Sequence, residues 1–101
     1  MAFRAPVSME IYGYIERGDE VYHEIVLYEN ETFVIELEAE DDGVDLDFYL
    51  ANQDNEVIYK DEERASGAAV QLEVGSTGMF TLYIKAVDGD TNYVLKLQEQ
   101  G

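Results

Sequence analysis

The segment Thr32–Glu40 reads TFVIELEAE and constrains the fold more than any other part of the chain. Its apolar residues are Phe33, Ile35, Leu37 and Ala39, and its outward glutamates are Glu36, Glu38 and Glu40. Because successive side chains of a β-strand point to opposite faces, this period of two predicts a strand with one buried face and one solvated face.

The same alternation recurs about every ten residues between turn-forming residues, which is typical of antiparallel sandwiches. Asn30 suits a tight turn because asparagine adopts positive φ at little cost. Asp88-Gly89-Asp90 is a hairpin signal. We therefore expect an all-β, jelly-roll-like antiparallel sandwich of about eight strands without a long helix. The expected strands are Ser8–Ile15, Glu20–Tyr28, Thr32–Glu40, Val44–Ala51, Glu56–Lys60, Ala68–Val74, Met79–Val87 and Thr91–Gln98.

The length of 101 residues predicts one domain, residues 1–101, with a single apolar core. No internal repeat or linker divides the chain. The inward positions of the expected strands give the core: Phe33, Ile35, Leu37, Leu46, Phe48, Leu50, Val70, Leu72, Phe80, Leu82, Ile84, Tyr93, Leu95 and Leu97.

Charge limits the partners of this chain. Its 23 acidic and 6 basic residues give a net charge of −17, which repels nucleic-acid phosphates and anionic membranes. For this reason we do not expect nucleic-acid binding. We do not expect membrane insertion either, since no apolar run approaches membrane-spanning length. The opening MAFRAPVSME lacks the apolar region of a signal peptide. Either the protein is made without one, or the chain is a domain excised from a longer precursor.

Four segments, taken in order, resemble the bacterial pre-peptidase C-terminal (PPC) domain family: Glu31–Leu37, Val44–Leu50 (VDLDFYL), Gly78–Ile84 and Asn92–Leu97. The likeness spans about Ile11–Leu97. Asn30 and Phe80 stand where the family usually has glycine and tyrosine. The resemblance implies a small β-sandwich without catalysis that is secreted or on the cell surface and is associated with other proteins.

A second family is the alternative. Asp45–Gly67 followed by Gly78-Met79-Phe80 resembles the Golgi-dynamics (GOLD) β-sandwich. The closing strand at Asn92-Tyr93 and the turn at Gly18-Asp19 fit the PPC family better, so we prefer that family. Both resemblances imply a non-catalytic sandwich.

The acidic stretch Glu40–Leu50 has two interpretations. Asp45 and Asp47 share one face of their strand. The PPC resemblance implies that these side chains brace neighbouring turns by accepting backbone N–H bonds, and we favour this interpretation. Because calcium takes six to eight oxygen ligands, a calcium site is the alternative. Its candidate ligands here are Asp41, Asp42, Asp45 and Asp47.

A second acidic segment, Asp88-Gly89-Asp90-Thr91-Asn92, is similar to the start of an EF-hand loop, and Glu99 falls at the twelfth position. Tyr93 stands at the sixth position, where an EF-hand needs glycine, and no flanking helices are expected. We interpret the segment as a hairpin turn. A looser calcium site at Asp88 and Asp90 is the alternative.

Catalysis is not expected. His23 is the only histidine, and it lies on the inward face of its expected strand, so we expect a packed, hydrogen-bonded ring. No serine occupies a nucleophile-elbow setting, and the absence of cysteine excludes thiol chemistry. No cofactor is expected, apart from the calcium alternative.

Four outward-pointing tyrosine and lysine residues suggest a binding surface. Tyr83 and Lys85 alternate out of one expected strand, Lys96 out of the last, and Tyr49 out of Val44–Ala51. If these strands are neighbours, the four side chains form a tyrosine and lysine patch. We therefore expect a non-catalytic module that binds a protein or polysaccharide surface. The alternatives are a self-assembling structural subunit and a calcium-stabilised binding domain.

Overall fold

The computed structural model describes residues 6–41, 43–63 and 65–100. It confirms the all-β fold, and the described residues contain no helix and hence no helical membrane span. Each strand bound lies within two residues of the expected one. The strands are β1 (Ser8–Ile15), β2 (Glu20–Leu27), β3 (Thr32–Ala39), β4 (Leu46–Ala51), β5 (Val57–Asp61), β6 (Gly67–Glu73), β7 (Gly78–Ala86) and β8 (Thr91–Gln100).

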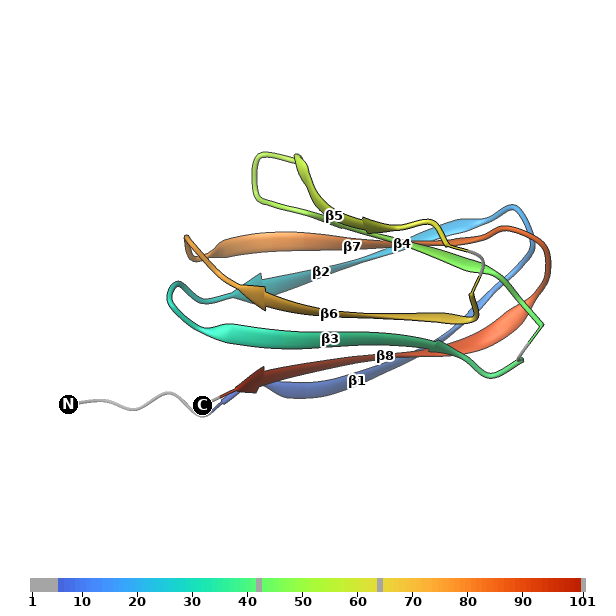
Figure 1. Cartoon of the computed structure of the whole chain (residues 1–101), viewed down its shortest axis with the longest axis horizontal. Coiled ribbons are helices and arrows are strands. Elements are labelled where there is room, and N and C mark those ends of the chain that lie inside the picture. Colours follow the sequence, from blue (N-terminus) through green and yellow to red (C-terminus); the bar gives the residue numbers. More distant parts are fainter. Residues whose placement is uncertain (1–5, 42, 64, 101) are drawn as a thin grey trace.

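Two four-stranded antiparallel sheets face each other (Figure 1). The first, here called the β8 sheet, has the order β1-β8-β3-β6; the second, the β7 sheet, has the order β2-β7-β4-β5. This pair of strand orders is that of a jelly roll. The outer face of each sheet therefore combines segments that are far apart in the sequence.

The connections explain why one expected hairpin is wrong. Asp88-Gly89-Asp90 links β7 to β8, but β7 pairs with β2 and β4, whereas β8 pairs with β1 and β3. Both edges of β7 are thus occupied, and the chain must cross to the other sheet. Among the described strands, β4 and β5 are the only consecutive pair that forms a hairpin.

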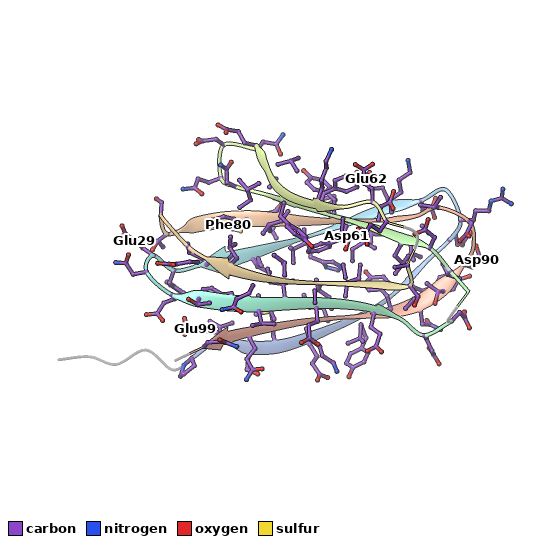
Figure 2. All side chains as sticks on the ribbon, viewed as in Figure 1. Glu29, Asp61, Glu62, Phe80, Asp90 and Glu99 are labelled. Carbon is purple, nitrogen blue, oxygen red and sulfur yellow. The ribbon has the colours of Figure 1, made fainter. Side chains whose placement is uncertain are left out.

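The core lies between the two inner faces and contains the residues expected from the alternation, with two exceptions. Val70 and Leu72 are half-buried because β6 is an edge strand with a single neighbour in its sheet. Phe80 lies between the sheets, whereas Glu62 and Asp90 lie on the outside (Figure 2). Asn30 adopts φ 65°, as expected for its turn.

A polar side-chain contact also links the two sheets through Tyr93, a residue of the core. Tyr93 of β8 is buried over Gly13 of β1, and its hydroxyl lies 2.7 Å from Nε2 of His23 on β2. Burial lowers the pKa of His23 and raises that of Tyr93. The expectation of a packed, hydrogen-bonded histidine is confirmed. A Cβ at position 13 would lie 2.5 Å from Cζ of Tyr93, so the contact requires glycine there.

Replacing Gly13 by Ala should therefore lower the free energy of unfolding by about 1–3 kcal/mol, because the new methyl group displaces the Tyr93 ring. Urea unfolding measures this change. Gly75→Ala is the matched control, since a Cβ at Gly75 meets no atom within 4 Å. Equal, small effects of the two substitutions would contradict the packing described here.

Candidate functional site

Four acidic residues that the sequence analysis gave as candidate metal ligands lie in the loops at the end of the sandwich shown on the right of Figure 1. They are Asp41, Asp45, Asp88 and Asp90. Asp88 Oδ1 accepts the backbone N–H of Asp45 at 2.8 Å. Asp45 Oδ1 accepts the N–H of Ala65 at 3.2 Å, and Asp45 is 9% exposed. These two carboxylates therefore join the β3–β4, β5–β6 and β7–β8 loops.

The same end of the sandwich contains two further ties. Asp90 Oδ1 accepts the N–H of Arg17 at 2.8 Å, and the N–H of Asp41 donates to Thr91 Oγ1 at 3.1 Å. The β1–β2 loop is thus also attached to the β7–β8 loop. The carboxylates of Asp45, Asp88 and Asp90 thus brace the loops by accepting backbone N–H groups.

The described residues contain no group of three or more His, Asp or Glu side chains placed to hold a metal ion. Asp42 lies outside the described residues. Glu99 is at the other end of the molecule from Asp90 (Figure 2), where its Oε2 accepts the N–H of Val7 at 3.3 Å. The segment that begins at Asp88 is therefore not arranged as an EF-hand.

Asp47 lies apart from this loop cluster, on the outer face of the β7 sheet opposite Lys85. Its Oδ1 is buried and has no hydrogen-bond partner among the described residues. Burial raises the pKa of Asp47, and the negative charges of Asp45 and Glu62 add to this effect, whereas Lys85 opposes it. This oxygen does not brace a turn.

Three tyrosines form a row across the outer face of the β7 sheet. Cross-strand pairing places Tyr22 of β2 beside Tyr83 of β7, and Tyr83 beside Tyr49 of β4. The centroids of the Tyr22 and Tyr83 rings are 6.3 Å apart. We call Tyr22, Tyr83 and Tyr49 the tyrosine row.

Two hydroxyls of the tyrosine row are held by neighbouring side chains. Tyr49 donates to Glu62 Oε2 at 3.1 Å, and Tyr83 donates to Asn55 Oδ1 at 3.3 Å. Burial and then the hydrogen bond to Glu62 raise the pKa of Tyr49 to about 12. A hollow of about 280 Å³ lies beside these rings; its lining is Glu20, Tyr49, Ala51, Asn55, Val57 and Tyr83.

The structure separates the four residues expected to form one patch. Tyr49, Tyr83 and Lys85 lie together on the outer face of the β7 sheet. Lys96 lies on the other sheet, in register between Glu10 and Glu36. The separation follows from the crossing between β7 and β8, because these two consecutive strands belong to different sheets.

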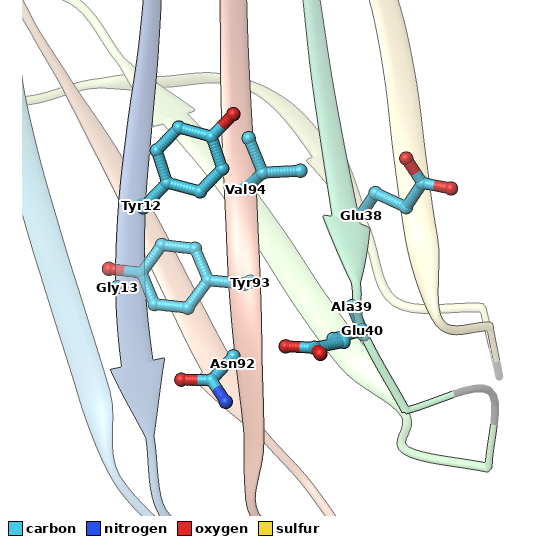
Figure 3. Close-up of a pocket in the computed structure, with 8 residues that line it drawn as sticks. All are labelled: Tyr12, Gly13, Glu38, Ala39, Glu40, Asn92, Tyr93 and Val94. Atoms are coloured by element: carbon cyan, nitrogen blue, oxygen red, sulfur yellow. The ribbon is translucent and has the colours of Figure 1, made fainter.

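A groove of about 750 Å³ on the outer side of the β8 sheet was not expected from the sequence (Figure 3). We call it the β8 groove; its lining is Tyr12, Gly13, Glu38, Ala39, Glu40, Asn92, Tyr93 and Val94. Alternation in β1 does indicate that Tyr12 and Tyr14 point outward. It does not indicate that Glu38 of β3 lies two strands away from Tyr12 in the same row.

No protein-family model matches the chain, and no curated protein shows significant sequence similarity to it. Two solved structures are similar in fold. The pre-peptidase C-terminal domain of collagenase from Bacillus anthracis matches with a TM-score of 0.75 and 17% identity, over 90% of this chain and 89% of that one.

The second is PliG from Aeromonas hydrophila, a periplasmic inhibitor of g-type lysozyme. It matches with a TM-score of 0.71 and 12% identity, over 99% of this chain and 93% of that one. The chain thus has a PPC-like fold, as the sequence resemblance implied. Identities this low support the fold alone.

Replacing Asp47 by Asn should raise the free energy of unfolding at pH 7 by on the order of 0.5 kcal/mol, because it removes a desolvated charge from among other acids. Folding raises the pKa of Asp47, so wild-type stability falls as the pH rises through its titration. The gain should disappear below the ordinary aspartate pKa of 3.8. Urea unfolding at several pH values measures it.

Asp54→Asn, in the exposed β4–β5 loop, is the control with the same change in net charge. An equal gain from both substitutions would mean that general charge repulsion, and not the surroundings of Asp47, is responsible.

Proposed function

We propose that this chain is a non-catalytic binding module that holds the surface of a protein or polysaccharide against the tyrosine row. The observation that supports the proposal most strongly is the alignment of Tyr22, Tyr83 and Tyr49 on three adjacent strands. Tyrosine offers a large amphipathic contact area and has few rotatable bonds to immobilise on binding.

The tyrosine row is preorganised for contact. It stands on paired strands, and the bonds from Tyr49 to Glu62 and from Tyr83 to Asn55 restrict two of the rings. Asn55 itself is tied into the β4–β5 loop, where its backbone N–H donates to the carbonyl of Asn52 at 2.9 Å. Less side-chain freedom is then lost when a partner binds.

The adjoining hollow adds selectivity to this surface. Glu20 and Asn55 contribute polar groups, and Ala51 and Val57 contribute apolar lining. A group that protrudes from the partner can enter the hollow, while a flatter surface rests on the rings.

A binding role also agrees with the chemistry of the titratable groups. His23 is half-buried and bonded to Tyr93, and it lines neither the hollow nor the β8 groove. Among solved structures with this fold, one is an inhibitor of a lysozyme, and an inhibitor acts by contact with its enzyme.

The rival is a self-assembling subunit. It is favoured by the exposed Val57 and Ile58 on β5, an edge strand of the β7 sheet. Exposed apolar edge strands promote pairing between chains. The net charge of −17 opposes such pairing, because copies of the chain repel each other.

Light scattering coupled to size-exclusion chromatography should therefore give a mass near 11.5 kDa that does not change with protein concentration. A mass that grows with concentration and returns to the monomer value in Ile58→Lys would instead support the structural subunit.

Binding itself can be measured with cellulose, chitin, peptidoglycan and an array of purified proteins as probes. For any probe that binds, Tyr22→Ser/Asn55→Ala should weaken binding about tenfold, the loss expected for a central aromatic contact. The control Gln71→Ser changes an exposed side chain on β6 of the opposite sheet, outside the lining of the β8 groove, and should bind like the wild type. Weakening by the control alone, or binding to no probe, would contradict the proposal.

A further inference from the structure

The β8 groove presents three kinds of side chain in one row across its sheet. Tyr12 of β1 pairs with Val94 of β8, which in turn pairs with Glu38 of β3. Tyr12 and Glu38 are thus two strand spacings apart, or about 10 Å, with Val94 between them. The groove therefore has an aromatic wall at Tyr12, an apolar floor at Val94 and an acidic wall on β3. In Figure 3 the carboxylate of Glu40 faces β8, whereas the exposed side chain of Glu38 is turned toward β6 and reaches the groove by rotating about its own bonds.

The aromatic wall is available to a ligand. Tyr12 is 72% exposed, and its hydroxyl donates to the carboxylate of Glu10. That bond holds the polar end of the ring while most of the side chain remains exposed. The neighbouring Tyr14 is 54% exposed and extends the aromatic wall along β1.

The acidic wall has no neutralising ion pair within the part of the chain that the structure describes. Glu38 is in register with Val94 and Gly67, and neither Glu38 nor Glu40 has an ion-pair partner among the described residues. Lys96 lies one row away, where Glu10 and Glu36 flank it in register. The carboxylate of Glu40 extends toward β8 and Asn92 (Figure 3).

We propose that the β8 groove binds arginine side chains of a basic polypeptide. A guanidinium group stacks flat on a tyrosine ring and forms paired hydrogen bonds with a carboxylate. Tyr12 supplies the ring, Glu38 and Glu40 supply the carboxylates, and the methylene groups of arginine pack on Val94. The net charge of −17 attracts such a partner from a distance.

This site is independent of the tyrosine row, since the two occupy opposite outer faces of the sandwich. A neutral saccharide is the competing occupant, because it also stacks on tyrosine and bonds to carboxylate and amide groups. Glu38 and Glu40, which form no ion pair with any described residue, favour the cation, since a saccharide leaves their charges unneutralised.

A peptide of alternating glycine and arginine is the probe, and the same peptide with citrulline replacing arginine is its control, because citrulline keeps the shape and loses the charge. The titration is followed by amide NMR shifts in about 0.1 M salt, where the Debye length is about 10 Å. The arginine peptide should shift the signals of Tyr12, Glu38, Asn92 and Val94. The citrulline peptide should shift none of them.

Three tyrosine variants and a matched pair of glutamate double variants separate binding in the groove from general charge attraction. Tyr12→Ser should weaken binding about three- to tenfold without changing the net charge, Tyr12→Phe should retain binding, and Tyr22→Ser on the other face should have no effect. Glu38→Gln/Glu40→Gln should weaken binding more than Glu24→Gln/Glu56→Gln, which removes the same charge from exposed positions outside the groove.

Equal weakening by the two glutamate pairs, or shifts spread evenly over the surface, would overturn the proposal in favour of general charge attraction. Citrulline binding as tight as arginine binding would overturn it in favour of a neutral ligand such as a saccharide. Thermal melting of each variant verifies folding. Because Tyr22→Ser tests the other face, failure here leaves the proposed function of the tyrosine row standing.

Discussion

Apolar contact between the inner faces of the two sheets is the interaction on which this structure depends. Phe33 and Phe48, one from each sheet, are almost completely buried there. The contact must overcome the self-repulsion of a chain with a net charge of −17. Strict alternation makes this feasible, because it places Glu36 and Glu38 on the outer face, where water and salt screen them.

The jelly-roll order adds a second requirement, since nearly every connection must cross from one sheet to the other. Such loops are not held by a hairpin ladder and need other ties. Asp45, Asp88 and Asp90 provide them by accepting backbone N–H groups from neighbouring loops. Part of the negative charge is thereby used to position the loops at one end of the sandwich.

Local pattern was sufficient to predict the strands and their inner faces. The alternation in Thr32–Glu40 survives in β3 because a one-residue slip would expose its entire apolar face. Local pattern does not predict which strands pair in a sheet, since pairing depends on contacts between segments that are distant in sequence. Asp88-Gly89-Asp90 indicates a turn, but nothing within it shows that β8 must pair with β1 and β3.

The same limit explains the outcome for the surfaces. Alternation alone identifies Tyr49 and Tyr83 as outward-pointing, yet their adjacency to Tyr22, and the separation of Lys96 from Lys85, follow from the register. The β8 groove was missed for this reason. Its two walls, Tyr12 and Glu38, come from strands that meet only through β8.

The central claim is that the carboxylates serve as loop braces and screened surface, not as a cation site. Thermal melting at fixed ionic strength, with millimolar calcium, magnesium or sodium, tests it most directly. We predict one melting midpoint for all three cations and a rise only when the ionic strength itself increases above about 0.1 M. A melting midpoint that calcium alone raises by several degrees, with the rise abolished in Asp45→Asn, would contradict the claim that the carboxylates form no cation site.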